Sequence, residues 1–413
     1  ISITPLLPIF IKEMPNVKNI YFIYILFVIN TSISYYFSYK RNLIIADQKI
    51  YIYTLFKYLF YFVLNVLQIF ILILTKNYIL YLIIQIICTF LENLSISIRA
   101  NRMYPYLKDK NVDKLDVKTK NEIVKNTKAM MMHKIGATVV NGTDNILLSK
   151  FVSLISVGLY SNYYLITSSL HKILSQVYSS ALAIICNLCV SNNIDTQYKV
   201  FKKIDFLGYW LYSFSSVCLL CLFNPFINLW VGKEYIFNFN IVIILVINYY
   251  IFGMRKAVLA FREASGLFYK DRWKAIIEAI VNLVTSILLA FKFGTFGVFL
   301  GTLISSVTVC VWVEPYVLFK YGFKMNLWKY FKQYFKYLFV TVILGVITYF
   351  ICSMVCFNVY ISFLIKLIIC IIVPNLLLIL IFYRTDEFKY YFDLIKKILS
   401  KITKKCGLTK KVV

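Results

Sequence analysis

Long apolar runs, separated by short charged segments, recur from one end of the sequence to the other. Each run holds about 20 residues, the length that a helix needs to cross the apolar core of a bilayer. A helix also makes all of its backbone hydrogen bonds internally, as a segment surrounded by lipid must. The pattern therefore predicts an all-α, polytopic membrane protein. Eleven complete spans are expected, at residues 19–38, 50–74, 78–99, 129–149, 157–190, 204–223, 237–255, 271–291, 296–320, 336–354 and 359–383.

The composition supports a protein that faces lipid along most of its length. Hydrophobic residues make up 61% of the chain and charged residues only 15%, whereas soluble domains are about half apolar and one quarter charged. This excess excludes a soluble enzyme with a single membrane anchor.

The basic residues lie in the segments between the spans and indicate the orientation. Lys and Arg number 45 against 18 Asp and Glu, which gives a net charge of +27. If successive spans alternate in direction, 35 of these 45 fall on one side of the membrane and six on the other. Because Lys and Arg are concentrated in cytoplasmic loops, the richer side is predicted to be cytoplasmic, and the C-terminal tail with it. Charge distributed in this way indicates topology and no nucleic-acid partner, which would require a basic face.

Part of the chain repeats at a distance of 217 residues. The shift lays 19–38 on 236–255, 50–74 on 267–291 and 78–99 on 295–316 without a gap. Six spans separate the equivalent helices, so the repeats would be parallel in the membrane. The counterpart of the span at 129 would lie before Ile1, and the sequence begins with only a short apolar stub. We therefore expect an N-terminally incomplete chain, with fourteen helices in the whole protein.

This repeat and the charge pattern predict the domain organisation. Residues 1–100 would be the remainder of a first six-helix lobe, 101–128 a charged cytoplasmic linker, 129–320 a second six-helix lobe, 321–383 two additional helices, and 384–413 a basic cytoplasmic tail.

Two consecutive predicted helices, 129–149 and 157–190, each carry a stripe of polar residues along one face. A stripe of this kind cannot face lipid, so we expect both to face protein or a water-filled cavity. Ordinary hydrogen bonding between helices is the alternative explanation. The first stripe comprises Lys134, Thr138, Asn141, Asn145 and Ser149, with His133 and Asp144 on its flank. The second comprises Ser161, Ser168, Lys172, Ser175 and Ser179, with His171 beside it.

Other features of the spans have structural interpretations. Lys274 and Glu278 are spaced for a pair within one helix, and Glu314 is expected to pair with a nearby basic residue. Gly297 and Gly301 have the spacing of closely packed helices. The Cys186-x-x-Cys189 and Cys218-x-x-Cys221 pairs have a zinc-like spacing, but in apolar helices cysteine behaves as a small hydrophobic residue. We therefore expect no metal and no cofactor.

Several stretches resemble one known branch of transporters. TDNILLSKFVSLISVGLYSNYYLI (143–166) is similar to the start of the second lobe in bacterial polysaccharide flippases, the Wzx-like branch of the superfamily that also holds MATE drug exporters and lipid II flippases. Four further stretches resemble the same branch: FSYKRNLIIADQK (37–49), PFINLWVGKEY (225–235), ASGLFYKDRWKAIIEAIVNL (264–283) and GTFGVFLGT (294–302).

The resemblance implies a MATE-like two-lobe helical bundle around a central cavity. Such a protein flips an undecaprenyl-diphosphate-linked oligosaccharide, the repeat unit of O-antigen or capsule, to the outer leaflet of the bacterial plasma membrane. It is a transporter and no enzyme, and a polysaccharide polymerase is a conceivable partner beside the membrane lipids.

The polar residues then receive candidate roles. Asp144 would couple transport to an ion gradient, unless it makes only a structural hydrogen bond. Residues expected to meet the substrate phosphates in the cavity are Lys134, Lys172, His133, His171, Asn141 and Asn145. Residues expected at the cytoplasmic mouth are Arg99, Arg255, Lys256 and Arg262.

Two other functions remain open on the sequence. A membrane glycosyltransferase or polymerase of the same pathway would need polar groups at an outer site, yet the outer connections are short and hold only Glu13 and Glu234 as clear acids. A MATE-type drug exporter would need an acidic cavity for cationic drugs, against which Lys134 and Lys172 argue.

Overall fold

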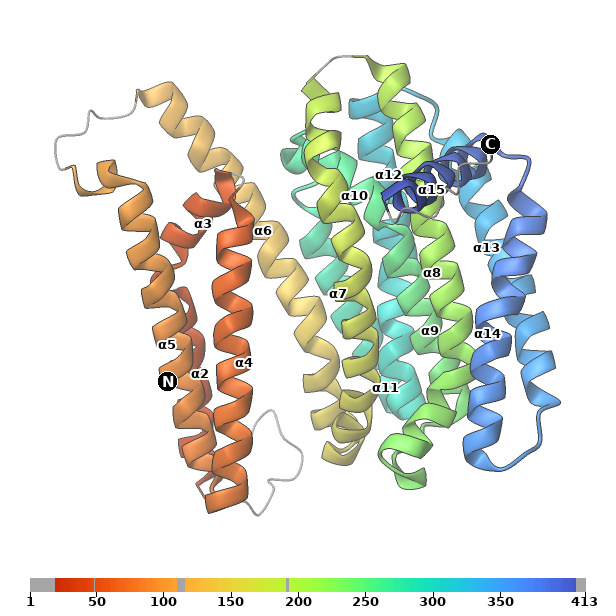
Figure 1. Ribbon diagram of the computed structural model, residues 1–413, viewed down its shortest axis with the longest axis horizontal. Helices are drawn as coiled ribbons and strands as arrows, with labels where there is room; N and C mark the ends of the chain where they lie inside the picture. Colours follow the sequence, from red (N-terminus) through yellow and green to blue (C-terminus); the bar gives the residue numbers. More distant parts are fainter. Residues whose placement is uncertain (1–18, 48, 110–115, 191–192, 406–413) are drawn as a thin grey trace. The chain divides into compact units, whose positions relative to one another are not determined.

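The computed structural model describes residues 19–47, 49–109, 116–190 and 193–405. The predicted N-terminal stub lies outside these residues. The described chain consists of helices and their connections, without a β-strand, which confirms the predicted all-α fold. It divides into two compact units, residues 1–120 and 121–413 (Figure 1).

The first unit is a small group of helices around α5. Both α2 and α4 pack against α5, and α2 and α3 meet at a bend of 44°. The turn between α3 and α4 is fixed by Asp47, which accepts hydrogen bonds from the Lys49 ammonium at 2.7 Å and the Tyr104 hydroxyl at 2.7 Å. These two donors, Lys49 first, hold the pKa of Asp47 below its ordinary value. The helices are α2 (Ile20–Tyr36), α3 (Ser38–Ala46), α4 (Ile50–Thr75) and α5 (Tyr78–Met103).

The second unit is a larger helical bundle built around α8. This helix packs against α7, α9, α10, α13 and α14, and much of it is buried. Aromatic rings fill the space around it, as where Tyr209 stacks on Tyr337 with centroids 3.9 Å apart. The helices are α6 (Val117–Leu147), α7 (Leu154–Val190), α8 (Ile194–Trp230), α9 (Phe239–Met254), α10 (Lys256–Ala264), α11 (Lys274–Ser305), α12 (Val311–Val317), α13 (Trp328–Ser353), α14 (Val359–Phe382) and α15 (Asp386–Lys405).

Helix α11 is folded back on itself at Gly294. This glycine has φ 56° and ψ −132°, a conformation that costs little without a Cβ atom. The legs before and after it meet at Gly297 and Gly301, where a Cβ atom would collide with Leu289 and Ser286 of the first leg. The two predicted spans 271–291 and 296–320 are thus antiparallel neighbours, and the predicted close packing of the two glycines is confirmed.

Seven helices of the described residues are long and apolar enough to cross a membrane, or eight if α2 and α3 form one bent span. They include α4, α5, α8, α13 and α14, and together they establish a multi-pass membrane protein. The seven do not include α6 and α7, so the eleven predicted spans remain a prediction. Helix α6 begins at Val117, so the second part of the predicted linker is helical and continuous with the predicted span 129–149.

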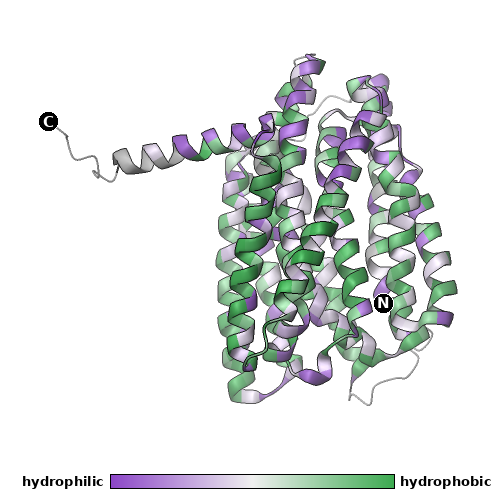
Figure 2. Ribbon diagram, turned by 90° about the vertical axis from the view of Figure 1, so that its right-hand side faces the viewer, coloured by the Kyte–Doolittle hydropathy of each residue, from purple (hydrophilic) through white to green (hydrophobic). Residues whose placement is uncertain are grey.

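The C-terminal tail, predicted only as basic, contains the helix α15. It follows α14 after three residues and extends sideways from one end of the second unit (Figure 2).

Candidate functional site

A buried polar network joins α6 to both legs of α11. Asp144 is only 8% exposed and accepts a hydrogen bond from the Thr302 hydroxyl at 2.9 Å. The same hydroxyl accepts a hydrogen bond from the Asn282 amide at 3.0 Å, so its own proton is available to Asp144. Ser305 accepts a longer bond from Asn282 at 3.5 Å. Asp144 is therefore hydrogen-bonded to the hairpin of α11.

The polar stripe on α6 lies on a different face from Asp144. Lys134, Thr138 and Asn145 are exposed, whereas Ser149 is buried near the end of the helix. The side chains of His133 and Asn141 lie outside the described residues. Asp144 thus points into the second unit, while the exposed part of the stripe faces out of it.

The second predicted stripe, on α7, is exposed at Lys172. Within the described part of the chain, neither Lys172 nor Lys134 has a carboxylate partner. His171, by contrast, is half-buried among rings of other helices. Its ring centroid lies 4.4 Å from that of Tyr249 and 4.5 Å from that of Phe252. The structure therefore places His171 in aromatic packing and Lys172 on the open face.

A cluster of four charged side chains is buried between α9, α11 and α12. The guanidinium of Arg255 donates to both carboxylate oxygens of Glu314, from Nε at 2.8 Å and from Nη2 at 2.6 Å. Lys274 Nζ lies 2.6 Å from Glu314 Oε1 and 3.0 Å from Glu278 Oε2. The Glu314 side chain is wholly buried. Two cations and two anions thus neutralise one another, as buried charges require.

This cluster changes the interpretation of the predicted cytoplasmic mouth. Arg255 is held by Glu314, and Arg262 is buried and paired with Asp271. Lys256 is half-buried, with Nζ 4.2 Å from the ring centre of Phe252, and Arg99 is exposed in the first unit. Arg255 and Arg262 are therefore ion-paired inside the bundle, and their charges are not free to attract an anion.

The sequence revealed this cluster only in part. The Lys274–Glu278 pair was predicted from its spacing and is confirmed. Pairing of Glu314 with a basic residue was also predicted and is confirmed. The partner Arg255, however, is 59 residues away and was assigned to the mouth. The signal in the sequence is a glutamate within an apolar run. A carboxylate there needs a cation beside it, but the sequence does not show which segment supplies that cation.

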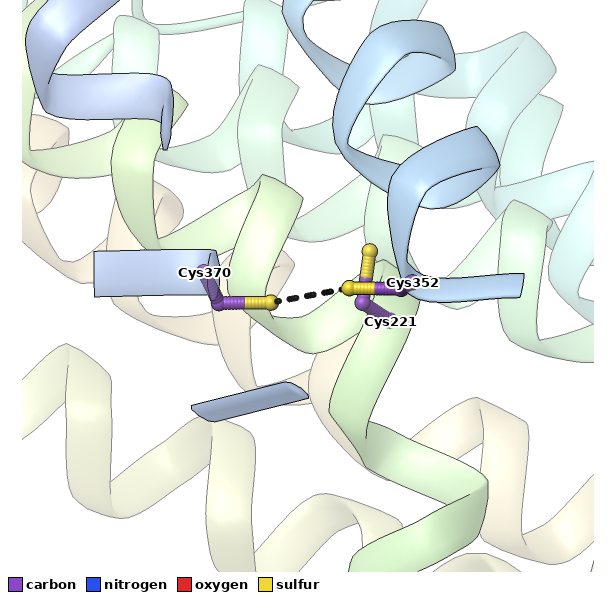
Figure 3. Close-up of side chains that lie close together, drawn as sticks. All are labelled: Cys221, Cys352 and Cys370. Atoms are coloured by element: carbon purple, nitrogen blue, oxygen red, sulfur yellow. Dashed lines mark hydrogen bonds between the residues drawn. The ribbon is translucent and has the colours of Figure 1, made fainter. Parts of the chain in front are cut away.

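Three buried cysteines from different helices meet in the second unit: Cys221 of α8, Cys352 of α13 and Cys370 of α14 (Figure 3). Their sulfur atoms lie within 4.8 Å of one another, and Cys352 and Cys370 are 3.9 Å apart. Such spacing would suit a soft metal ion. A divalent ion held by three thiolates would leave a net negative charge here, next to Leu222 and Ile369. The surroundings therefore favour packing of neutral thiols.

The two predicted cysteine pairs do not come together. Cys221 joins Cys352 and Cys370, whereas Cys189 lies beside Ser265, with Sγ 3.5 Å from the serine Oγ. The zinc-like spacing in the sequence thus has no counterpart in a shared site. The absence of a metal or cofactor stays a prediction.

Comparison with known proteins gives one informative match. No protein-family model matches the sequence, and no curated protein is significantly similar to it. A solved structure of the lipid II flippase MurJ in an inward closed conformation is similar to the chain, with a TM-score of 0.50 and 19% sequence identity. The match covers 80% of this chain and 65% of that protein, so the chain spans less than two thirds of its length. This likeness establishes a MurJ-like fold.

Proposed function

We propose that this chain is a transporter that flips a lipid-linked oligosaccharide, carried on undecaprenyl diphosphate, from the inner to the outer leaflet of the bacterial plasma membrane. The MurJ-like fold supports a flippase over an enzyme by analogy, because the solved structure that shares this fold is a lipid II flippase. The observation that carries the substrate assignment is the exposure of Lys134 and Lys172, without carboxylate partners in the described chain, on two consecutive helices.

In this proposal the two lysines bind the diphosphate of the carrier lipid. A lysine ammonium acts on phosphate as a point charge, without the fixed geometry of an arginine fork, and so can follow a group that moves between two conformations. Asn145 is exposed on the same helix, about 16 Å further along it than Lys134, and would add a hydrogen bond to another part of the substrate. The resemblance of the sequence to polysaccharide flippases favours a surface polysaccharide repeat unit as the cargo, with the C-terminus cytoplasmic.

Ion coupling is assigned to Asp144 in the same proposal. Its hydrogen bond from Thr302 connects α6 to the second leg of α11. Uptake of H⁺ or Na⁺ by the carboxylate would remove the charge that this hydroxyl faces. The packing between α6 and the hairpin would then differ between the loaded and empty states, which is what alternation between two conformations requires.

The substrate assignment is tested by complementation with the full-length protein. Lys134→Gln and Lys172→Gln should each reduce surface polysaccharide in a strain that lacks its own flippase by one to two orders of magnitude, because about 1–3 kcal/mol of charge-assisted binding is lost. Lys→Arg at either position should retain most of the export. Lys150→Gln, an exposed lysine after α6, is the matched control and should export normally.

Two outcomes would contradict the proposal. Normal export by both Gln variants, at a normal protein level, would exclude a phosphate role for the lysines. Rescue of a strain depleted of its lipid II flippase, with no rescue of a polysaccharide flippase mutant, would assign the cargo to cell-wall synthesis instead.

A further inference from the structure

Helix α15 is amphipathic along its whole length. Its apolar residues follow the spacing i, i+3, i+4, i+7, which places them on one face of an α-helix. In the described side chains these are Phe388, Tyr391, Phe392 and Ile395, and in the sequence the same spacing continues through Ile398, Leu399 and Ile402. The remaining positions are mostly lysine or other polar residues.

The first turns of α15 are fixed to α8. The ring of Phe388 stacks on Trp210 with centroids 5.8 Å apart, and the Tyr391 hydroxyl donates to the carbonyl oxygen of Lys203 at 3.1 Å. Lys203 Nζ lies 3.7 Å from the centre of the Tyr390 ring. These contacts fix the direction of α15. They also place its first turns beside the point where the apolar part of α8 begins.

Beyond these contacts, α15 runs sideways away from the second unit (Figure 2). The apolar face that packs on α8 continues there without a protein partner in the described chain, since Phe392 is 50% exposed and Ile395 is 55% exposed. Helix α14 ends at Phe382, so α15 starts three residues after the chain leaves the apolar run of a membrane-spanning helix. Its axis crosses those of the apolar helices α13 and α14 (Figure 1), which is the orientation expected of a helix that lies in the membrane surface.

The charge of this free part is uniformly positive. Residues 394–405 contain five lysines and no acidic residue. A second copy of α15 is a poor partner, because apposed apolar faces would bring like charges together at their rims. A bilayer surface with anionic phospholipids fits both properties, since acyl chains accept the apolar face and phosphate groups attract the lysines.

We propose that α15 is an interfacial helix that lies in the membrane surface beside the bundle and binds anionic phospholipids. Its free part inserts the face that contains Ile395 below the headgroups and holds Lys396 and Lys397 at headgroup level. This inference depends only on the membrane location of the chain and is independent of the transported cargo.

A photo-crosslinking experiment on the full-length protein tests the insertion. The photoreactive residue p-benzoylphenylalanine replaces either Ile395 or Asp393, which are both exposed and lie on opposite faces of α15. The protein is reconstituted in nanodiscs of phosphatidylcholine with phosphatidylglycerol, irradiated, and weighed by mass spectrometry. We expect a phospholipid adduct at position 395 and at least fivefold less at position 393. Equal adducts at both positions, no lipid adduct at 395, or a crosslinked protein dimer would overturn the proposal.

The lipid specificity needs a second comparison. An anionic surface contributes about a fivefold gain in binding for each nearby lysine. The adduct at position 395 should therefore fall severalfold in nanodiscs of phosphatidylcholine alone. Lys396→Gln combined with Lys397→Gln should cause a similar fall in the mixed nanodiscs, with normal purification and oligomeric state. An adduct that is insensitive to both changes would refute the role of the lysines.

Discussion

The buried charge cluster of Arg255, Lys274, Glu278 and Glu314 makes a sharp prediction about stability. Glu314→Gln keeps the size and shape of the side chain but removes the negative charge that both cations share. The cluster would change from neutral to one net positive charge inside a membrane-spanning bundle. Glutamine can accept only part of the hydrogen bonds that Arg255 and Lys274 now donate to the carboxylate.

The magnitude follows from the short contacts and from burial. At an effective dielectric constant near 20, two unit charges at the 2.6 Å separation of Lys274 Nζ and Glu314 Oε1 attract by about 6 kcal/mol. Desolvation of the buried groups offsets most of that attraction. When Glu314 alone is replaced, the two cations stay buried, so the cost of their desolvation is not recovered. Breaking a buried pair in this way costs about 3–5 kcal/mol, which corresponds to a fall in Tm of roughly 10 °C.

Thermal unfolding of the purified protein in one detergent measures this effect. Lys202→Gln is the control, because the Lys202 side chain is 45% exposed and its ammonium lies 3.3 Å from Glu387, so that this pair should contribute less than about 1 kcal/mol. Lys274→Met in the Glu314→Gln background restores neutrality, since Arg255 can still pair with Glu278 at 3.8 Å. This double variant should recover part of the lost Tm. A Tm of Glu314→Gln within 2 °C of the control would show that the buried-charge reasoning is wrong.

Two further predictions concern α6 and the hairpin of α11. Asp144→Asn should keep the fold and the protein level but abolish gradient-dependent export, whereas Asp205→Asn, at another buried acid outside the network, should retain it; equal losses in both would show that burial alone explains the effect. Gly301→Ala should destabilise the protein by about 1–3 kcal/mol, because the new Cβ atom collides with Ser286, while Gly158→Ala, where nothing lies within 4 Å, should be neutral or stabilising in thermal unfolding; matching Tm values would disprove the close contact.

The apolar runs predict the helices well because lipid imposes a simple rule on sequence. The predicted spans 50–74 and 359–383 agree closely with α4 (Ile50–Thr75) and α14 (Val359–Phe382). Contacts between residues a few positions apart, such as Lys274 with Glu278, were equally accessible, since helix geometry alone brings them together.

Contacts between distant segments could not be derived in this way. Nothing in the sequence near Arg255 indicates that Glu314 will meet it, because their encounter depends on how α9 packs against α12. The position of Asp144 shows a finer limit. One residue is a rotation of about 100° around a helix, so Asp144, on the flank of the predicted polar stripe, is buried, while its neighbour Asn145 in the stripe is exposed. The apolar periodicity of α15, by contrast, is visible in the sequence. The segment is predicted only as a basic tail because its many lysines dominate its composition.

The helices of the second unit differ in whether their charged side chains have an oppositely charged partner. Some charged side chains that enter the packed part of the bundle meet an opposite charge, as Glu314 meets Arg255 and Asp271 meets Arg262, whereas Asp144 and Asp205 are buried with no basic partner among the described residues. A lysine within a predicted span is expensive unless its ammonium reaches a carboxylate, water or an anionic ligand. Lys134 and Lys172 depart from the paired pattern, and they do so on α6 and α7, the first two helices of the unit. In the proposed function, α6 and α7 are therefore the helices on which the binding of the anionic substrate should be sought.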